Sequence, residues 1–159
     1  MALNYGTSTS LTITAGSLTA GANRSSASVT VGNSNNVSAI MLSVNVLTSA
    51  TAPTVNKQIV VYGYYSEDGT NFNGASSTID NVDGTDKALT AIGSPTNLKF
   101  IGVLNKNQGA VAATLHSVFE VTGPLGCVPR KWGIVLLNDD GAAALGATVT
   151  ATYTEIYYS

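Results

Sequence analysis

The chain has one histidine, His116, and one cysteine, Cys127, the residue types that most often serve as catalytic base and nucleophile. His116 belongs to an alternating segment in which Glu120 is the nearest carboxylate. Four residues of extended strand span about 13 Å at ~3.3 Å per residue, which is too far for a hydrogen bond between the two side chains. A catalytic triad would need a partner from elsewhere, and nothing in the sequence marks one. We therefore interpret His116 as a structural or interface residue, and we expect no enzymatic activity.

Three carboxylates, those of Asp80, Asp83 and Asp86, lie close together in a Gly- and Ser-containing region. Such a group can surround Ca²⁺ in an extended loop, but the spacing differs from that of an EF-hand, which has ligands at alternate positions and a closing Glu. Acidic loops are more often simply solvated. We expect no metal or other cofactor and treat the three aspartates as interface candidates, with a Ca²⁺ site as the alternative.

Arg130 and Lys131 precede the only tryptophan, Trp132. A tryptophan beside two cations can stack on a base or a sugar. However, Pro129 stands before this group, and a purely aliphatic run and an Asp-Gly turn signal follow it. This pattern favours a strand that is buried on both faces, with Trp132 in the core and the two cations in water.

The composition of the 159 residues excludes several functions. Charged residues make up 10% of the chain, against about 25% in an ordinary soluble protein, and the net charge is −2. Nucleic-acid binding needs clustered Lys and Arg, so we expect none. A single cysteine allows no internal disulfide, and no apolar run is as long as a membrane span. Because the N-terminus has no signal-peptide pattern, we expect synthesis in the cytoplasm.

Alternating apolar and polar residues predict about eight strands, and no segment shows a helical period. The fold class is therefore all-β, and a two-sheet β-sandwich fits best, with the jelly roll as the most specific choice. We expect residues 1–10 to be a flexible arm, residues 11–159 to be a single domain, and residues 73–97 to be a long loop. The expected strands are residues 11–14, 28–31, 37–47, 57–65, 98–104, 110–122 and 148–158, together with a strand that starts at Pro129, contains Trp132 and is closed by the turn at residues 139–141.

The segment from Lys57 to Tyr65 is apolar on both faces. Ile59 and Val61 point one way, whereas Tyr62 and Tyr64 point the other way. Each face needs a cover, and a neighbouring subunit is one candidate. Tyr62 and Tyr64 are therefore interface candidates.

Three blocks of the sequence resemble a known group of proteins: Tyr64–Phe72, Pro95–Gly102 and Val128–Val135. They are similar to the small structural proteins of tailed bacteriophages that are described as decoration, cement or minor virion proteins. The resemblance covers roughly residues 56–158. It implies a β-rich protein, often trimeric, on the outside of the phage head.

The resemblance further implies that this protein binds the major capsid protein on the outer capsid surface and bridges neighbouring subunits to stabilise the shell. We expect a homo-oligomer, with a trimer favoured, and no membrane or nucleic-acid partner. Two alternatives stay open. One is another virion component, in the neck, tail or fibre base. The other is a carbohydrate-binding or adhesive β-sandwich with Tyr and Trp as sugar platforms and Ca²⁺ at the Asp80 loop.

Overall fold

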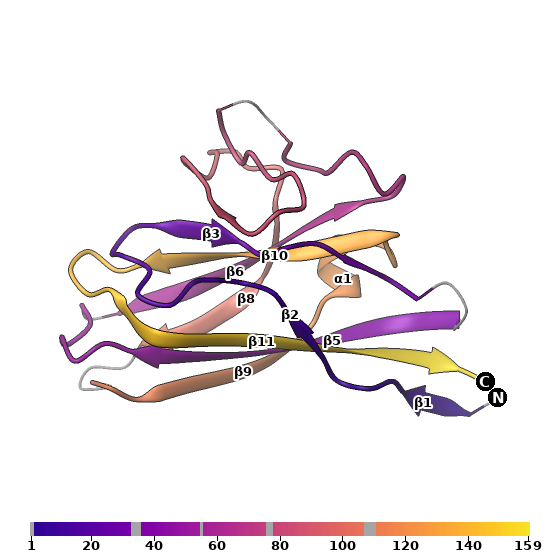
Figure 1. Cartoon of the computed structure of the whole chain (residues 1–159), viewed down its shortest axis with the longest axis horizontal. Helices are drawn as coiled ribbons and strands as arrows, with labels where there is room; N and C mark the ends of the chain where they lie inside the picture. The colour runs from indigo at the N-terminus through magenta and orange to yellow at the C-terminus, as the bar shows by residue number, and fades with distance from the viewer. Residues whose placement is uncertain (1, 33–35, 55, 76–77, 107–110) are drawn as a thin grey trace.

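A computed structural model describes residues 2–32, 36–54, 56–75, 78–106 and 111–159 (Figure 1). Within these ranges the regular secondary structure consists of β-strands and one helix of a single turn. The elements are Leu3–Tyr5 (β1), Thr9–Leu11 (β2), Asn23–Ser25 (β3), Val29–Thr30 (β4), Asn36–Thr48 (β5), Lys57–Ser66 (β6), Lys87–Ala88 (β7), Lys99–Lys106 (β8), Thr114–Glu120 (β9), Thr122–Leu125 (α1), Lys131–Asp139 (β10) and Leu145–Tyr158 (β11).

The strands form two antiparallel sheets, which lie one above the other in Figure 1. Sheet A has the order β1-β11-β5-β9, and β2 also pairs with β11. Sheet B has the order β7-β3-β10-β6-β8, and β4 also pairs with β10. The predicted all-β, two-sheet sandwich is confirmed.

A shared hydrophobic core fills the space between the sheets. Trp132 on β10 is fully buried, and its ring meets that of Tyr153 on β11 edge to face, with centroids 5.5 Å apart. These two residues come from opposite sheets, so their contact joins the layers. The prediction that Trp132 lies in the core is confirmed. The other fully buried side chains of this core include Ile40, Leu42, Val44 and Val46 from β5, Ile59 and Val61 from β6, and Ile134 and Leu136 from β10.

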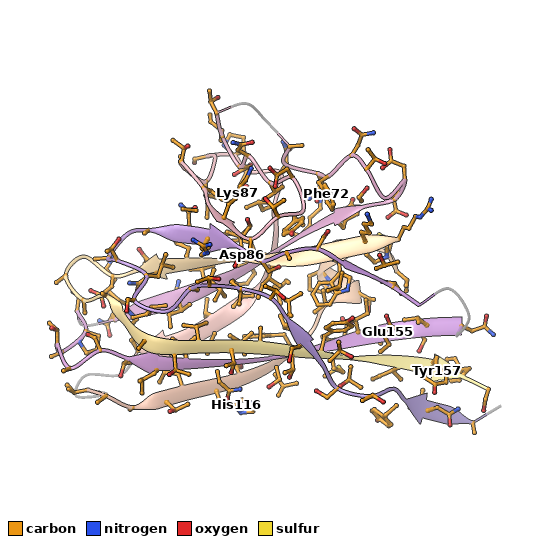
Figure 2. All side chains as sticks on the ribbon, in the orientation of Figure 1. Phe72, Asp86, Lys87, His116, Glu155 and Tyr157 are labelled. Atoms are coloured by element: carbon orange, nitrogen blue, oxygen red, sulfur yellow. The ribbon has the colours of Figure 1, made fainter. Side chains whose placement is uncertain are left out.

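A second, smaller core lies on the outer face of sheet B. Val82, Leu89 and Leu98, from the long loop and the residue after it, pack on Tyr64 and Val135. The half-buried Phe72, labelled in Figure 2, adds to this cluster. Gly133 makes room for the ring of Tyr64, because a Cβ at this position would lie 2.4 Å from the ring. The chain itself therefore covers the second apolar face of β6, for which a neighbouring subunit was a candidate.

Residues 1–10, which we expected to be a flexible arm, contain β1 and the first part of β2. Leu3 is paired with Tyr158, and the main chains of Ala2 and Ser159 exchange two hydrogen bonds of 3.1 Å. Main-chain pairing to the edge of β11 needs no apolar alternation, so the sequence pattern does not reveal it. The expected strand at residues 11–14 is likewise shifted to Thr9–Leu11.

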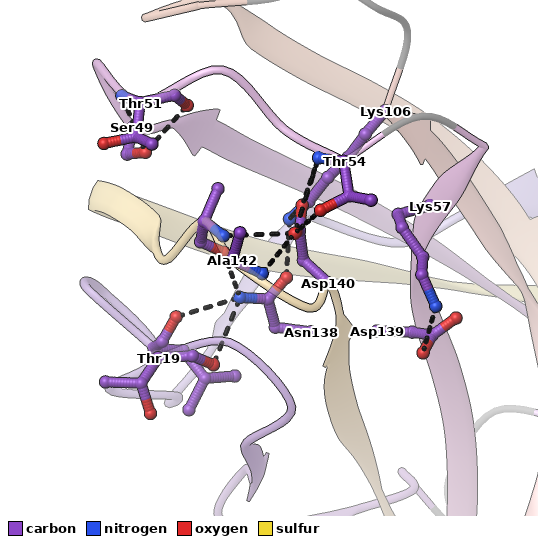
Figure 3. Close-up of polar contacts among 12 residues, drawn as sticks. Thr19, Ser49, Thr51, Thr54, Lys57, Lys106, Asn138, Asp139, Asp140 and Ala142 are labelled. Carbon is purple, nitrogen blue, oxygen red and sulfur yellow. Dashed lines mark hydrogen bonds and ion pairs between the residues drawn. The ribbon is translucent and has the colours of Figure 1, made fainter.

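A buried polar cluster lies at the C-terminal end of β10 (Figure 3). Lys106 and Asp140 form an ion pair of 3.1 Å, and their side chains are 1% and 0% exposed. The Lys106 ammonium also donates to Asn138 Oδ1 at 2.5 Å. Asp140 accepts further hydrogen bonds from the Thr54 hydroxyl at 2.8 Å and from the amide of Ala142 at 2.9 Å. The cluster therefore ties the end of β8, the loop before β6 and the β10–β11 turn together.

Candidate functional site

The carboxylate of Asp80 is hydrogen-bonded inside the long loop. Asp80 is 3% exposed, and it accepts hydrogen bonds from the amides of Gly93 and Asn97 at 2.7 and 3.0 Å and from the Thr96 hydroxyl at 2.8 Å. A buried carboxylate with these donors fixes the loop over sheet B. Asp80 therefore has a structural role inside the loop, and its carboxylate is not exposed at the surface.

Asp83 and Asp86 point to different partners. Asp83 accepts from Lys87 Nζ at 2.6 Å and from the amide of Thr85 at 3.0 Å. Partial burial alone would raise the pKa of Asp83, but the bonds from Lys87 and Thr85 lower it to about 2. Asp86, labelled in Figure 2 beside β3, binds Arg24 Nε at 2.6 Å.

The acidic loop therefore does not gather its carboxylates around a common point. Within the described ranges, no group of three or more His, Cys, Asp or Glu residues is placed to hold a metal ion. Asp83 is exposed and stays a surface candidate, whereas Asp86 anchors β7 to β3 through Arg24.

Tyr64 is fully buried, and its hydroxyl donates to the Ser26 carbonyl at 2.7 Å. Its ring packs edge to face on Phe72, with centroids 5.4 Å apart, and burial raises the pKa of the hydroxyl. Its side chain is thus buried in the smaller core and not exposed at the surface, where an interface candidate was expected. Tyr62 is half-buried and packs on Phe100, which is 57% exposed, so this pair does reach the surface.

His116 lies on the outer face of sheet A, where Figure 2 shows it on β9. It is exposed, and its Nε2 is 3.1 Å from the hydroxyl of Ser43 on β5. The register places Asn45 directly opposite His116, and Val118, which is 51% exposed, opposite Ser43. His116 is thus one member of a continuous surface that crosses three strands.

This surface, called the outer A face below, consists of Met41, Ser43 and Asn45 on β5, Thr114, His116, Val118 and Glu120 on β9, and Thr150, Thr152 and Thr154 on β11. Glu120 is its only carboxylate, and no Lys or Arg belongs to it. Glu120 itself bonds the amides of Thr122 and Gly123 at 2.6 and 2.8 Å, so it caps α1. The outer A face is therefore rich in hydroxyl groups and nearly uncharged.

β9 forms one edge of sheet A, because β5 is its only sheet partner among the described strands. Edge strands usually carry charges, prolines or bulges that prevent pairing with another chain. β9 has only Glu120 as a charged residue, and its register with β5 is regular over its whole length. It is thus open to association along its edge as well as over its face.

Cys127 is half-buried, and its thiol lies 2.9 Å from Glu67 Oε1. Burial raises the pKa of the thiol to about 11, and the hydrogen bond and charge of Glu67 add to this effect. A thiol in this setting stays protonated near pH 7, so Cys127 is poorly suited to act as a nucleophile.

The sequence pattern did contain the signal for the outer A face. The alternating threonines of residues 148–154 and the polar side of residues 37–47 both indicate strands with one solvated face. The sequence could not show that these strands are neighbours and that β9 extends the same surface.

Comparison with known proteins finds no family model and no curated protein that matches the chain. In the part of the chain that the structure describes, no helix has the length and apolarity to cross a membrane.

Proposed function

We propose that this protein is a virion structural protein that decorates the outer surface of a tailed-bacteriophage head and bridges neighbouring subunits of the major capsid protein. The resemblance of three sequence blocks to phage decoration proteins is the starting point. The strand order and the outer A face support it.

We propose a jelly roll as the specific fold, and the strand pairing supports this. We treat β1 and β2 as one strand because both pair with β11, and β3 and β4 as one strand because both pair with β10. With the two-residue β7 set aside, eight strands remain. The first strand (β1 and β2) pairs with the eighth (β11), and the second (β3 and β4) pairs with the seventh (β10). The third (β5) pairs with the sixth (β9), and the fourth (β6) pairs with the fifth (β8). Pairing that runs inward from the chain ends and alternates between two sheets is the jelly-roll connectivity, which is common in viral capsid proteins.

The outer A face is the observation that carries the proposal. A neutral, hydroxyl-rich surface can be buried without leaving unpaired charges, whereas most soluble proteins keep charges on such a surface. Each contact would be weak, and several sites on one oligomer would add avidity without new contacts. A homotrimer that holds three capsid sites fits this requirement.

Cosedimentation with expanded empty shells of the same phage tests the proposal. Val118→Lys and Asn45→Lys would each bring a charge into the interface, so we expect both variants to lose binding while their melting temperatures stay unchanged. Thr90→Lys, at an exposed position of the long loop, is the matched control and should bind like the unchanged protein.

Loss of binding in Thr90→Lys alone would move the interface to the long loop. If the unchanged protein fails to bind the shells and is monomeric by light scattering, the decoration function is excluded. Cryo-EM of intact particles separates the head from the alternative locations, since density at the neck or tail alone would favour another virion component.

A further inference from the structure

An open groove lies between the two sheets, near the chain termini. It is bounded by the segment that connects β1 to β2, by β4 and the residues after it, and by the last part of β11, where Figure 2 labels Glu155 and Tyr157. Its volume is about 400 Å³, within the range of roughly 300–1,000 Å³ that small-molecule sites occupy. The lining residues are Gly6, Thr7, Thr9, Thr30, Gly32, Tyr153, Glu155 and Tyr157.

The lining has a distinct chemistry. It combines three threonine hydroxyls, two tyrosines and one carboxylate, and it includes no Lys or Arg. Hydroxyls both donate and accept hydrogen bonds, a carboxylate accepts strongly, and an aromatic ring offers an apolar face. A ligand that matches the hydroxyls, the carboxylate and the aromatic rings must present several hydroxyl groups and a patch of C–H groups.

Glu155 is held with one oxygen available. Its Oε1 accepts a hydrogen bond from the amide of Gly32 at 3.0 Å, whereas the described residues give no hydrogen bond to Oε2. A Cβ at Gly32 would lie 3.1 Å from Oε2, so the absence of a side chain keeps the space beside this oxygen open. The carboxylate is therefore oriented before any ligand binds.

Tyr153 and Tyr157 form two walls of the groove. Tyr153 packs against the buried Trp132 and is hydrogen-bonded to Thr9. Burial raises the pKa of Tyr153, and the charge of Glu155 adds to this, so its hydroxyl stays protonated. Tyr157 borders the space above Gly6, where a Cβ would be 3.8 Å from Cε1 of its ring.

We propose that this groove is a binding site for a neutral saccharide. Glu155 Oε2 accepts hydrogen bonds from sugar hydroxyls, the ring of Tyr157 packs on a C–H face of the sugar, and Thr7 and Thr30 bind the remaining hydroxyls. A quaternary ammonium ligand also binds to tyrosines and a carboxylate, but its cationic group forms no hydrogen bonds with the threonine hydroxyls. This activity is independent of the decoration function, and it uses neither Trp132, which is fully buried, nor Asp80, whose carboxylate is bonded within the long loop.

NMR titration of the ¹⁵N-labelled full chain tests the proposal. The probes are glucose, galactose, rhamnose and N-acetylglucosamine at millimolar concentrations, with choline chloride in a separate titration. We expect at least one sugar to shift the amide resonances of Gly6 and Gly32. Glu155→Gln should weaken this binding by roughly tenfold or more, because it removes hydrogen bonds to a charged acceptor.

Tyr157→Ala should also weaken binding, whereas Tyr158→Ala is the matched control, since the neighbouring Tyr158 does not line the groove. Thermal melting checks that each variant is folded. If Glu155→Gln is destabilised, Thr30→Val, which removes one hydroxyl, replaces it. The proposal is overturned if no sugar shifts Gly6 or Gly32, if choline alone does so, or if Tyr158→Ala weakens binding as much as Tyr157→Ala.

Discussion

Replacement of Lys106 by methionine is the most informative test of how the sandwich is stabilised. The Lys106 ammonium bonds Asp140 at 3.1 Å and Asn138 at 2.5 Å, and the pair is shielded from water. Removal of one member of a buried ion pair usually costs about 3–5 kcal/mol, because the other charge is left without compensation. Asp140 keeps its bonds from Thr54, Ala142 and Ala143, so we expect a loss near the lower limit, about 3 kcal/mol.

The assay is urea unfolding of the unchanged protein, Lys106→Met, Asp140→Asn and the double variant at pH 7. For a chain of this length a loss of about 3 kcal/mol corresponds to a fall in melting temperature of roughly 6–12 °C. The double variant leaves no buried charge, so its loss should be smaller than the sum of the two single losses. If Lys106→Met changes stability by less than about 0.5 kcal/mol, or if the two effects simply add, the pair does not stabilise the fold as argued.

The same cluster makes the stability of the fold depend on pH in the acidic range. Burial alone would raise the pKa of Asp140, but the amides of Ala142 and Ala143, the Thr54 hydroxyl and Lys106 together lower it below its usual range. A lowered pKa in the folded state contributes stability that is present above the unfolded value of about 3.9 and is lost as the pH falls through the folded value. The melting temperature of the unchanged protein should therefore decrease as the pH is lowered from about 4, and that of Asp140→Asn should decrease less steeply.

Two further substitutions test the two hydrophobic cores. Trp132→Ala should cost roughly 3–5 kcal/mol in urea unfolding, as large truncations in a core do, and a normal stability with lost binding would show that Trp132 belongs to a site. Tyr64→Phe removes the bond to the buried Ser26 carbonyl, so it should cost about 1–2 kcal/mol at unchanged volume; an unaffected melting temperature would contradict the role given to this hydroxyl.

The long strands of the sandwich could be predicted because each has a core face with a period of two. In β5, residues 40, 42, 44 and 46 are all fully buried, as the alternation in the sequence indicates. The short strands β1, β3 and β7 have no such pattern, since two or three residues held by main-chain hydrogen bonds do not need a periodic side-chain face. Their positions follow from partners far along the chain.

The sequence predicted the candidate surfaces less completely, for the same reason. The two apolar faces of β6 show that each must be covered, but not that the long loop covers the second one. Tyr64 and Asp80 are therefore buried where exposure was expected. Lys106 resembles a solvated strand end in the sequence, and only the approach of Asn138 and Asp140 reveals that it is buried.

The few charges of the chain are distributed in a way that connects its composition to its surface. Four of its seven basic side chains, those of Arg24, Lys57, Lys87 and Lys106, form ion pairs with aspartates. These pairs hold loops and strand ends in place, and none lies on the outer A face. The low charge content is therefore not spread evenly over the molecule. The outer A face is left nearly neutral, a property that suits association through short-range contacts.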